Sequence, residues 1–200
     1  ADVDPGDHGQ RVILPSTFNG SPRNYHERMQ DALAIVAEEG PPALFITMTT
    51  NPNWPEIRNA LLPGQSAVDR PDLVARVFRM RKNQLMADIK AGMLGEYVGE
   101  IGVVEFQKRG FPHLHVVVFL TEPIRPEFWD TYVCAEIPDP ETDPQLHQTI
   151  TKCNLHACGR GRCGAEIGNE NPDNCGVYYP KDFRNTTAIP ENTFRVEYRR

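Results

Sequence analysis

One stretch of the chain decides its fold: residues 97–120 read YVGEIGVVEFQKRGFPHLHVVVFL. Two runs within it, Tyr97 to Gln107 and His113 to Leu120, are rich in β-branched and aromatic residues, which are typical of strands. A short segment containing a glycine and a proline joins the two runs. Connections of this length usually link antiparallel neighbours. The stretch therefore predicts a β-hairpin with its turn near Arg109 and Gly110.

Helix start and stop signals define the elements before this hairpin. A first helix is predicted to begin after Ser21, an N-cap residue followed by Pro22, and to stop at Gly40. An apolar strand is predicted over residues 43–50, where Asn-Pro ends the run. Together with the hairpin, these elements indicate the α+β class.

A second helix is predicted between the apolar strand and the hairpin. We expect Asp69 to cap it, Pro71 to be its first residue, and Gly92 to lie near its end. Its apolar positions recur at helical spacing and predict a buried face: Leu73, Val74, Val77, Phe78, Leu85 and Ile89. The polar face carries five bases, which form either a solvated surface or a phosphate-binding one: Arg76, Arg79, Arg81, Lys82 and Lys90.

The composition is that of an ordinary globular protein. Hydrophobic residues make up 40% and charged residues 24% of the 200 positions, which argues against disordered, collagen-like and coiled-coil chains. Apolar runs such as residues 116–120 are far shorter than the roughly 18 residues of a membrane span. The first ten residues, ADVDPGDHGQ, lack the pattern of a secretion signal. We therefore expect a soluble, intracellular protein without a membrane partner.

The net charge of −6 is confined to one segment. Seven acidic residues and one basic residue lie between Glu122 and Asp143, so this Pro-rich segment accounts for the whole charge. The neutral remainder is compatible with a basic groove for nucleic acid, which relies on Lys and Arg. The changes in composition along the chain predict three parts. These are a tail or linker over residues 1–10, a core over 11–133 and an appended region over 134–200, with a short helix over 144–150.

The hairpin carries candidate metal ligands. His113 and His115 are one residue apart on a predicted strand, so both imidazoles project from the same face. Glu105 and Gln107 share a face of the preceding strand and lie opposite the histidines if the turn is placed correctly. Two imidazoles and a carboxylate suit a divalent cation such as Mn²⁺, Mg²⁺ or Zn²⁺. The alternative is structural, with one histidine buried and hydrogen-bonded and the other solvated.

The sequence around these histidines resembles that of a known family. Residues 103–117, VVEFQKRGFPHLHVV, are similar to the His-hydrophobe-His region of Helitron transposase replication-initiator (Rep) domains, which are HUH endonucleases. Other segments resemble the same family in the same order: RVILPSTFNGSP at 11–22, LFITMTTNPNWPEI at 44–57, DRPDLVARVF at 69–78 and AEIPDP at 135–140. The resemblance covers nearly everything from Arg11 onward, which makes it more specific than the histidine pair alone.

The resemblance implies a Rep-type domain with a central antiparallel sheet flanked by helices. Such domains bind single-stranded DNA and break it with a tyrosine, while two histidines and a third polar residue hold a divalent cation. It therefore assigns His113 and His115 as ligands, with Glu105 preferred to Gln107 because a carboxylate offsets cation charge. It also implies a nuclear protein and a helicase domain fused in the full-length polypeptide. DNA contacts are expected at Thr47, Thr49, Asn51, Trp54, Arg79, Lys108 and Arg109, although Thr47 and Thr49 equally suit a strand as β-branched residues.

The nucleophilic tyrosine is not evident. The family places one or two tyrosines on a helix downstream, with a lysine nearby, and residues 178–181, YYPK, spell Tyr-x-x-Lys. Pro180, however, disfavours a regular helix here. The stretch also falls where the family tends to show a Phe-Pro-Lys-like segment after its cysteines. Tyr178 and Tyr179 are therefore disfavoured as nucleophiles, and we expect the chain to end before its catalytic helix and to be inactive alone.

A Cys/His-rich segment near the C-terminal end predicts a second metal. Its five candidate ligands fall in a Gly-rich stretch too polar to bury a core, which Zn²⁺ binding would fold: Cys153, His156, Cys158, Cys163 and Cys175. The four cysteines are the preferred ligands because zinc favours thiolates, and His156 is the replacement. Disulfides and unligated reduced thiols are the alternatives. The family has a comparable Cys/His-rich segment, but its spacing differs.

The leading hypothesis is the nicking and joining domain of a Helitron-type rolling-circle transposase. One alternative is a non-catalytic single-stranded DNA-binding module with a structural zinc. Another is a metal-dependent hydrolase that activates water and needs no tyrosine.

Overall fold

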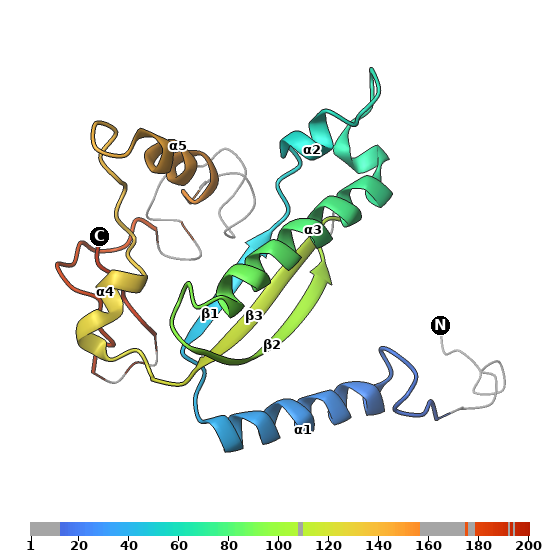
Figure 1. The fold of residues 1–200 in the computed structure, drawn as a ribbon, viewed down its shortest axis with the longest axis horizontal. Coiled ribbons are helices and arrows are strands. Elements are labelled where there is room, and N and C mark those ends of the chain that lie inside the picture. The colour runs from blue at the N-terminus through green and yellow to red at the C-terminus, as the bar shows by residue number, and fades with distance from the viewer. Residues whose placement is uncertain (1–12, 108–109, 157–174, 176–178, 192, 194) are drawn as a thin grey trace, which may run out of the picture. The chain divides into compact units, whose positions relative to one another are not determined.

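The core of the protein is a three-stranded antiparallel sheet. The computed structural model (Figure 1) describes residues 13–107, 110–156, 175, 179–191, 193 and 195–200. Its strands are β1 (Leu44–Thr49), β2 (Tyr97–Phe106) and β3 (Pro112–Leu120), in the spatial order β1-β3-β2. The predicted hairpin is confirmed, since β2 pairs antiparallel with β3. The strand that carries both histidines is therefore the central one.

The hairpin turn has the predicted centre. Phe106 pairs with Pro112 at the end of the ladder, which places the turn midway between them. Gly110 has φ of 76° and donates its N–H to the Gln107 carbonyl over 2.7 Å. A positive φ is available to glycine without steric cost, which explains why this residue closes the turn. Lys108 and Arg109 lie outside the described residues.

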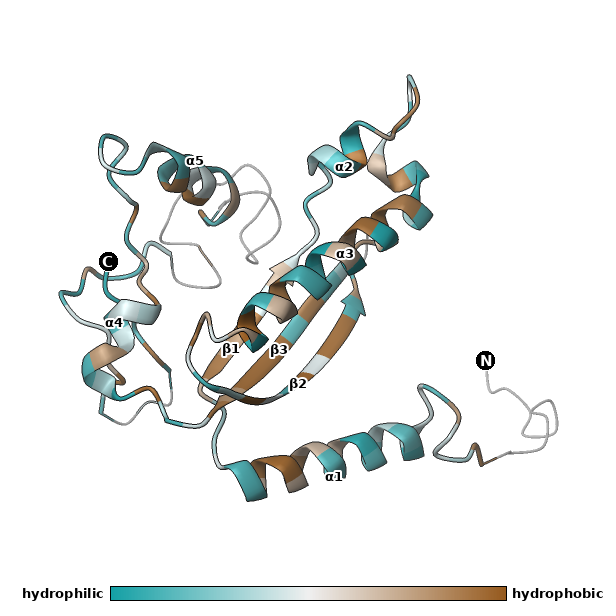
Figure 2. Cartoon of the chain, in the orientation of Figure 1, coloured by the Kyte–Doolittle hydropathy of each residue, from teal (hydrophilic) through white to brown (hydrophobic). Residues whose placement is uncertain are grey.

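The sheet has two chemically different faces. Leu114, Val116 and Val118 alternate along β3 and are almost completely buried, whereas His113 and His115 between them are only partly buried. This period of two is the normal alternation of a strand. In Figure 2 the three strands are largely hydrophobic in colour, with hydrophilic positions between. One face therefore builds the core and the other presents the histidines.

Helix α3 (Pro71–Lys90) covers the apolar face of the sheet. Its residues Phe78 and Ile89 join the buried strand residues in one cluster. Every residue of its predicted apolar face is buried or half-buried, as the helical spacing required. A second cluster combines Ile57 of the short helix α2 (Pro55–Arg58) with Val74 and Val77 of α3.

One predicted cap is wrong. Arg70, not Asp69, precedes the first residue of α3. Asp69 instead ends the 3₁₀ helix η2 (Ala67–Asp69), where its Oδ2 accepts hydrogen bonds from the N–H and hydroxyl of Ser66 over 2.8 and 2.7 Å. The sequence Ser-x-x-Asp forms a capping box of its own. The Asp69 carboxylate therefore accepts hydrogen bonds at the start of η2 and does not cap α3.

Helix α1 (Pro22–Glu39) has its predicted ends. The Ser21 hydroxyl accepts the Asn24 N–H over 3.1 Å, and Gly40 follows the last turn with φ of 80°. The helix nevertheless buries none of its residues, and Tyr25, Met29 and Leu33 are more than half exposed. Local signals thus determine where this helix begins and ends, and only Ala32 and Val36 of its apolar positions are half-buried.

Two compact units divide the chain, the first ending at Pro123 and the second beginning at Ile124. The second unit contains η3 (Pro126–Phe128), α4 (Trp129–Tyr132) and α5 (Pro144–Cys153), the last confirming the predicted short helix with three further residues. Asp130 accepts the Thr187 N–H over 3.0 Å, and the Thr187 hydroxyl accepts the Arg199 N–H over 2.9 Å. These bonds connect α4 to the last residues of the chain. The α+β class is confirmed.

Candidate functional site

The two histidines lie side by side on the exposed face of the sheet. The ring centroids of His113 and His115 are 4.5 Å apart and the rings are inclined by 69°. Both side chains belong to the central strand, so residues of both neighbouring strands lie beside them. Thr49 and Glu105 pair with His113, and Thr47 and Val103 pair with His115.

Polar side chains from both neighbouring strands contact the ring of His113. The Thr49 hydroxyl lies 2.9 Å from its Nδ1, and the Gln107 amide nitrogen lies 3.4 Å from the same atom. When Nδ1 carries the proton, its N–H donates a hydrogen bond to the Thr49 hydroxyl and Nε2 keeps a free lone pair. Metal-binding histidines commonly have one nitrogen fixed in this way by a neighbouring oxygen.

His115 is held by an aromatic neighbour and faces a carboxylate. Phe45 stacks on its ring with centroids 5.6 Å apart and planes 7° from parallel. Its Nε2 lies 3.6 Å from Glu105 Oε2, a distance too long for a hydrogen bond. Its Nδ1 is buried and has no hydrogen-bond partner in the described part of the chain. The nitrogen that faces the carboxylate is therefore the accessible one.

The donor types at this face suit a divalent cation. Two neutral imidazoles and a carboxylate are common ligands of Mn²⁺ and Zn²⁺, and an amide oxygen from Gln107 is a further donor. Among the described residues, however, no three His, Cys, Asp or Glu side chains are already arranged around a common centre. The sheet brings the donors together, and their side chains would have to rotate to share one ion.

The first unit of the chain matches a known protein family. Residues 3–118 match the family described as the Helitron helicase-like domain at the N-terminus. The match covers more than half of the chain and includes both histidines, Glu105 and Thr49. The chain belongs to this Helitron family. The family resemblance inferred from the sequence is thereby confirmed over residues 3–118, and the segment at 135–140 lies outside the match. No curated protein matches the chain significantly.

The residues expected to contact DNA in this Helitron-family chain do not all lie on one surface. Thr47 and Thr49 lie on the histidine face. Asn51 follows β1 and uses its side-chain oxygen to accept the Asn53 N–H over 2.9 Å. Trp54 packs against both core clusters, and the Arg81 guanidinium lies 4.7 Å from its ring centroid. Arg79 lies on the exposed side of α3, whereas Lys108 and Arg109 lie outside the described residues.

Part of the predicted zinc cluster is gathered in the second unit. Cys175 is buried, and its Sγ lies 3.3 Å from Nε2 of His156. Cys153 is exposed at the end of α5 and forms no disulfide within the described residues. Cys158 and Cys163 lie outside the described residues. The contact brings His156, which was assigned only as a replacement ligand, next to a preferred cysteine.

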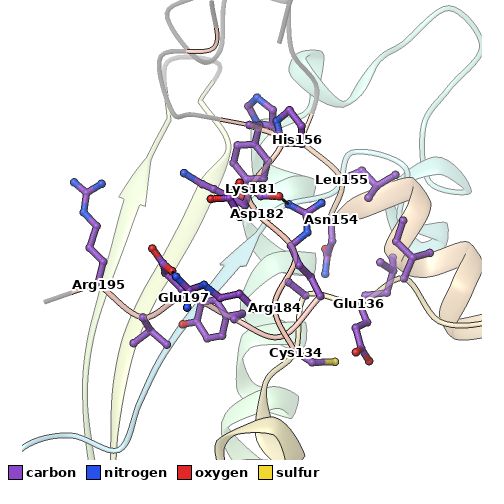
Figure 3. Close-up of a pocket in the computed structure, with 18 residues that line it drawn as sticks. Cys134, Glu136, Asn154, Leu155, His156, Lys181, Asp182, Arg184, Arg195 and Glu197 are labelled. Atoms are coloured by element: carbon purple, nitrogen blue, oxygen red, sulfur yellow. Dashed lines mark hydrogen bonds and ion pairs between the residues drawn. The ribbon is translucent and has the colours of Figure 1, made fainter. Parts of the chain in front are cut away.

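A pocket of about 800 Å³ lies beside this cluster in the second unit (Figure 3). Tyr179 lines it and stacks on His156, with centroids 4.2 Å apart. Arg184 forms an ion pair with Glu197 on its wall. The pocket mixes basic, acidic and apolar side chains, so its charge does not select a ligand class.

Sequence reasoning missed two aromatic residues of the first unit. Phe45 stacks on His115, and Phe106 has 67% of its surface exposed at the end of β2. Their alternation in strand runs signalled only that they fit a sheet. The only signal that could have singled out Phe45 is its place two residues from Thr47, on the same face.

None of the described helices is both long and apolar enough to cross a membrane.

Proposed function

We propose that this Helitron-family chain is the DNA-nicking and strand-transfer domain of a rolling-circle transposase of the HUH endonuclease class. One observation carries the proposal: His113, His115 and Glu105 meet on one exposed face of the family-matched sheet. The partners are single-stranded DNA and a helicase domain in the full-length protein, and the nucleus is the proposed location. The exposed face supports the proposal because a polynucleotide has to reach the ligands.

His113, His115 and Glu105 would hold a Mn²⁺ or Mg²⁺ ion, with Gln107 as a further donor and Zn²⁺ as the alternative metal. A bound cation of this kind polarises the scissile phosphate. The chain's own side chains prepare the ligands for it. The Thr49 hydroxyl orients the ring of His113, and Phe45 stacks beside the ring of His115 and limits its rotation. Fixed rings lose less conformational freedom when a ligand binds.

The proposed reaction needs a tyrosine hydroxyl. Its oxygen forms a bond to phosphorus, the bond from phosphorus to the 3′-oxygen breaks, and a 5′-phosphotyrosine and a free 3′-hydroxyl result. Tyr179 stacks on His156 in the second unit, and Tyr178 lies outside the described residues. We assign neither as the nucleophile. Incubation of this chain with single-stranded DNA and Mn²⁺ should give no covalent adduct, and an adduct mapped to either tyrosine would contradict this assignment.

We also propose that the second unit holds a structural Zn²⁺ through Cys153, Cys158, Cys163 and Cys175, with His156 as the alternative ligand. The close approach of Cys175 and His156 supports this proposal. A thiol and an imidazole beside each other are a frequent half of a tetrahedral zinc site.

Titration with Mn²⁺ by calorimetry tests the cation site. Wild type should bind the ion at the hairpin, and His113→Ala and His115→Ala should each remove this binding. His26→Ala is the matched control, because it deletes an exposed imidazole from α1. Equal Mn²⁺ binding by wild type and the double His113→Ala, His115→Ala variant would contradict the proposal and favour a non-catalytic DNA-binding module.

A further inference from the structure

We propose that a groove between α3 and strand β2 binds one or two nucleotides of single-stranded DNA, with a base on Phe106 and phosphate at Arg79 and Lys82. The proposal rests on the proposed function in one respect, that the substrate is single-stranded DNA. It adds a binding surface on the side of the sheet opposite the histidines.

The groove has a volume of about 370 Å³ and lies entirely within the first unit. Ligand sites usually measure about 300–1,000 Å³, so this groove has room for a small portion of a polymer. Its α3 wall is built from residues at helical spacing, and its other wall is the end of the hairpin. The lining residues are Ala75, Phe78, Arg79, Lys82, Val104 and Phe106, with Pro112 beside them.

Phe106 provides an exposed aromatic surface in this groove. Its side chain lies on the face of the sheet that builds the core, yet 67% of its surface is exposed. Its partner Pro112 is buried, and Phe78 on the helix wall is 3% exposed. The ring is therefore backed by the core while one side remains open. Bases of single strands stack on aromatic rings presented in this way.

The charge of the groove selects a polyanion over an apolar partner. Among the described residues that line it, Arg79 and Lys82 are the only charged ones. Neither has an ion-pair or hydrogen-bond partner in the part of the chain that the structure describes. Two other bases of the same helix are paired, since Arg81 contacts Glu56 and Lys90 contacts Glu100, at 2.9 and 3.0 Å. Two unpaired cations beside an aromatic ring are the elements of a single-strand binding groove.

The groove and the histidine face lie on opposite sides of the same edge of the sheet. Phe106 and Pro112 form one rung of the hairpin ladder, and Glu105 and His113 form the next. Adjacent rungs are about 3.3 Å apart along a strand, and β2 is an outer strand of the described sheet. A flexible single strand lying in the groove can therefore pass over this edge to the proposed metal ligands. A duplex cannot do so with its bases stacked on Phe106, because they are paired inside the helix.

Fluorescence anisotropy with a labelled oligothymidylate of about 12 nucleotides tests the groove. No Mn²⁺ or Mg²⁺ is added, so that a cation at the histidines makes no contribution while the proposed zinc of the second unit stays bound. Phe106→Ala should weaken binding about tenfold, and Phe106→Leu should weaken it similarly. Phe106→Trp should bind like wild type, because stacking needs an aromatic ring. The double Arg79→Gln, Lys82→Gln variant should also weaken binding. The slope of log affinity against log salt should become shallower by about 1.4, the value for two lost single-strand phosphate contacts.

Two matched controls accompany these variants. Tyr25→Ala removes an exposed aromatic ring from α1, and Arg58→Gln removes an exposed cation from α2. Both should bind the oligonucleotide like wild type. Unchanged affinity of the Phe106→Ala and Arg79→Gln, Lys82→Gln variants would overturn the groove proposal, as would equal competition by duplex DNA of the same length.

The outcomes separate this proposal from the proposed function. If wild type binds the oligonucleotide and the groove variants bind equally well, the groove is wrong and the nicking function is untouched. If the groove variants lose binding but wild type takes up no Mn²⁺ at the histidines, the groove stands and the nicking function fails. If wild type does not bind the oligonucleotide at all, both proposals fail.

Discussion

At the scale of single residues, the histidine face depends on contacts between neighbouring strands. The Thr49 hydroxyl reaches Nδ1 of His113 from a residue 64 positions away in the sequence. Glu105 reaches toward His115, not toward its direct partner His113, so the acid lies diagonally across the ladder. These contacts determine which ring nitrogens remain available to a ligand.

Thr49→Val tests this positioning role. The substitution keeps the β-branched shape and removes the hydroxyl beside His113. We expect Mn²⁺ affinity to fall about tenfold, in line with the loss of other hydrogen-bond partners of metal ligands, with little change in thermal stability. Calorimetry measures the affinity. Thr47→Val, which changes the residue paired with His115, is the matched control, and an equal loss in both variants would argue against a specific role for Thr49.

At the scale of elements, α3 links the two core clusters of the first unit. Its residues Phe78 and Ile89 pack on the sheet, while Val74 and Val77 pack on α2 and η2. Burial of this one face holds the sheet from a single side and leaves the other face open. By contrast, α1 is a complete, capped helix without buried residues.

Ile89→Ala should therefore destabilise the first unit strongly. Ile89 is 0% exposed in the core cluster, and truncation to alanine removes buried methylene groups and leaves a cavity. We expect a loss of about 3 kcal/mol in the free energy of unfolding, measured by urea denaturation. Met80→Ala on the exposed side of the same helix should change it by less than about 0.5 kcal/mol. Comparable losses in both variants would contradict the described packing.

At the scale of the whole molecule, the two units are stabilised by different kinds of interaction. The first has a continuous apolar core, whereas in the second the Asp130, Thr187 and Arg199 bonds connect segments distant in sequence. The hydrogen bonds from Thr187, and secondarily the nearby Arg199 guanidinium, lower the pKa of Asp130 from its usual 3.8. The charged carboxylate is therefore the form that the folded second unit favours.

This pKa shift predicts an acid-sensitive second unit. A carboxyl group whose pKa is lowered by folding stabilises the protein fully above its ordinary pKa, and the contribution disappears as pH falls through the lowered value. The second unit should loosen below about pH 4, as followed by the indole N–H resonance of Trp129, which donates to the Ile124 carbonyl. Asp130→Asn should reduce this pH dependence. An unchanged acid transition in the variant would show that other groups control it.

Removal of zinc should also affect only the second unit. If Cys175 is a zinc ligand, Cys175→Ser or a strong chelator should release Zn²⁺ and lower amide protection in residues from Ile124 onward, because metal binding would supply the folding energy there. Protection of the β2 and β3 amides should persist. Cys134→Ser, at an exposed cysteine, is the control. Purified protein without zinc, or equal effects of both substitutions, would contradict the proposal.

Local features of the sequence were sufficient to predict α1, α3, α5 and the three strands, but not the short helices α2 and α4. Ser21, Pro22 and Gly40 specified the ends of α1, and strand alternation with a glycine turn specified the hairpin and its register, since each signal acts over a few residues. The cap at Asp69 failed because two overlapping local signals, Ser66-x-x-Asp69 and Asp69 before Pro71, competed for one carboxylate.

Only the tertiary structure decided which distant residues surround the histidines. Pairing β1 with β3 brings Thr49 and Phe45 to the site. Packing of α3 against the hairpin places Arg79 and Lys82 on the wall of the groove that faces the exposed Phe106. No local pattern predicts these neighbours. They follow from the burial of Leu114, Val116 and Val118 under α3, a long-range requirement that determines which strand and which helix lie beside the hairpin.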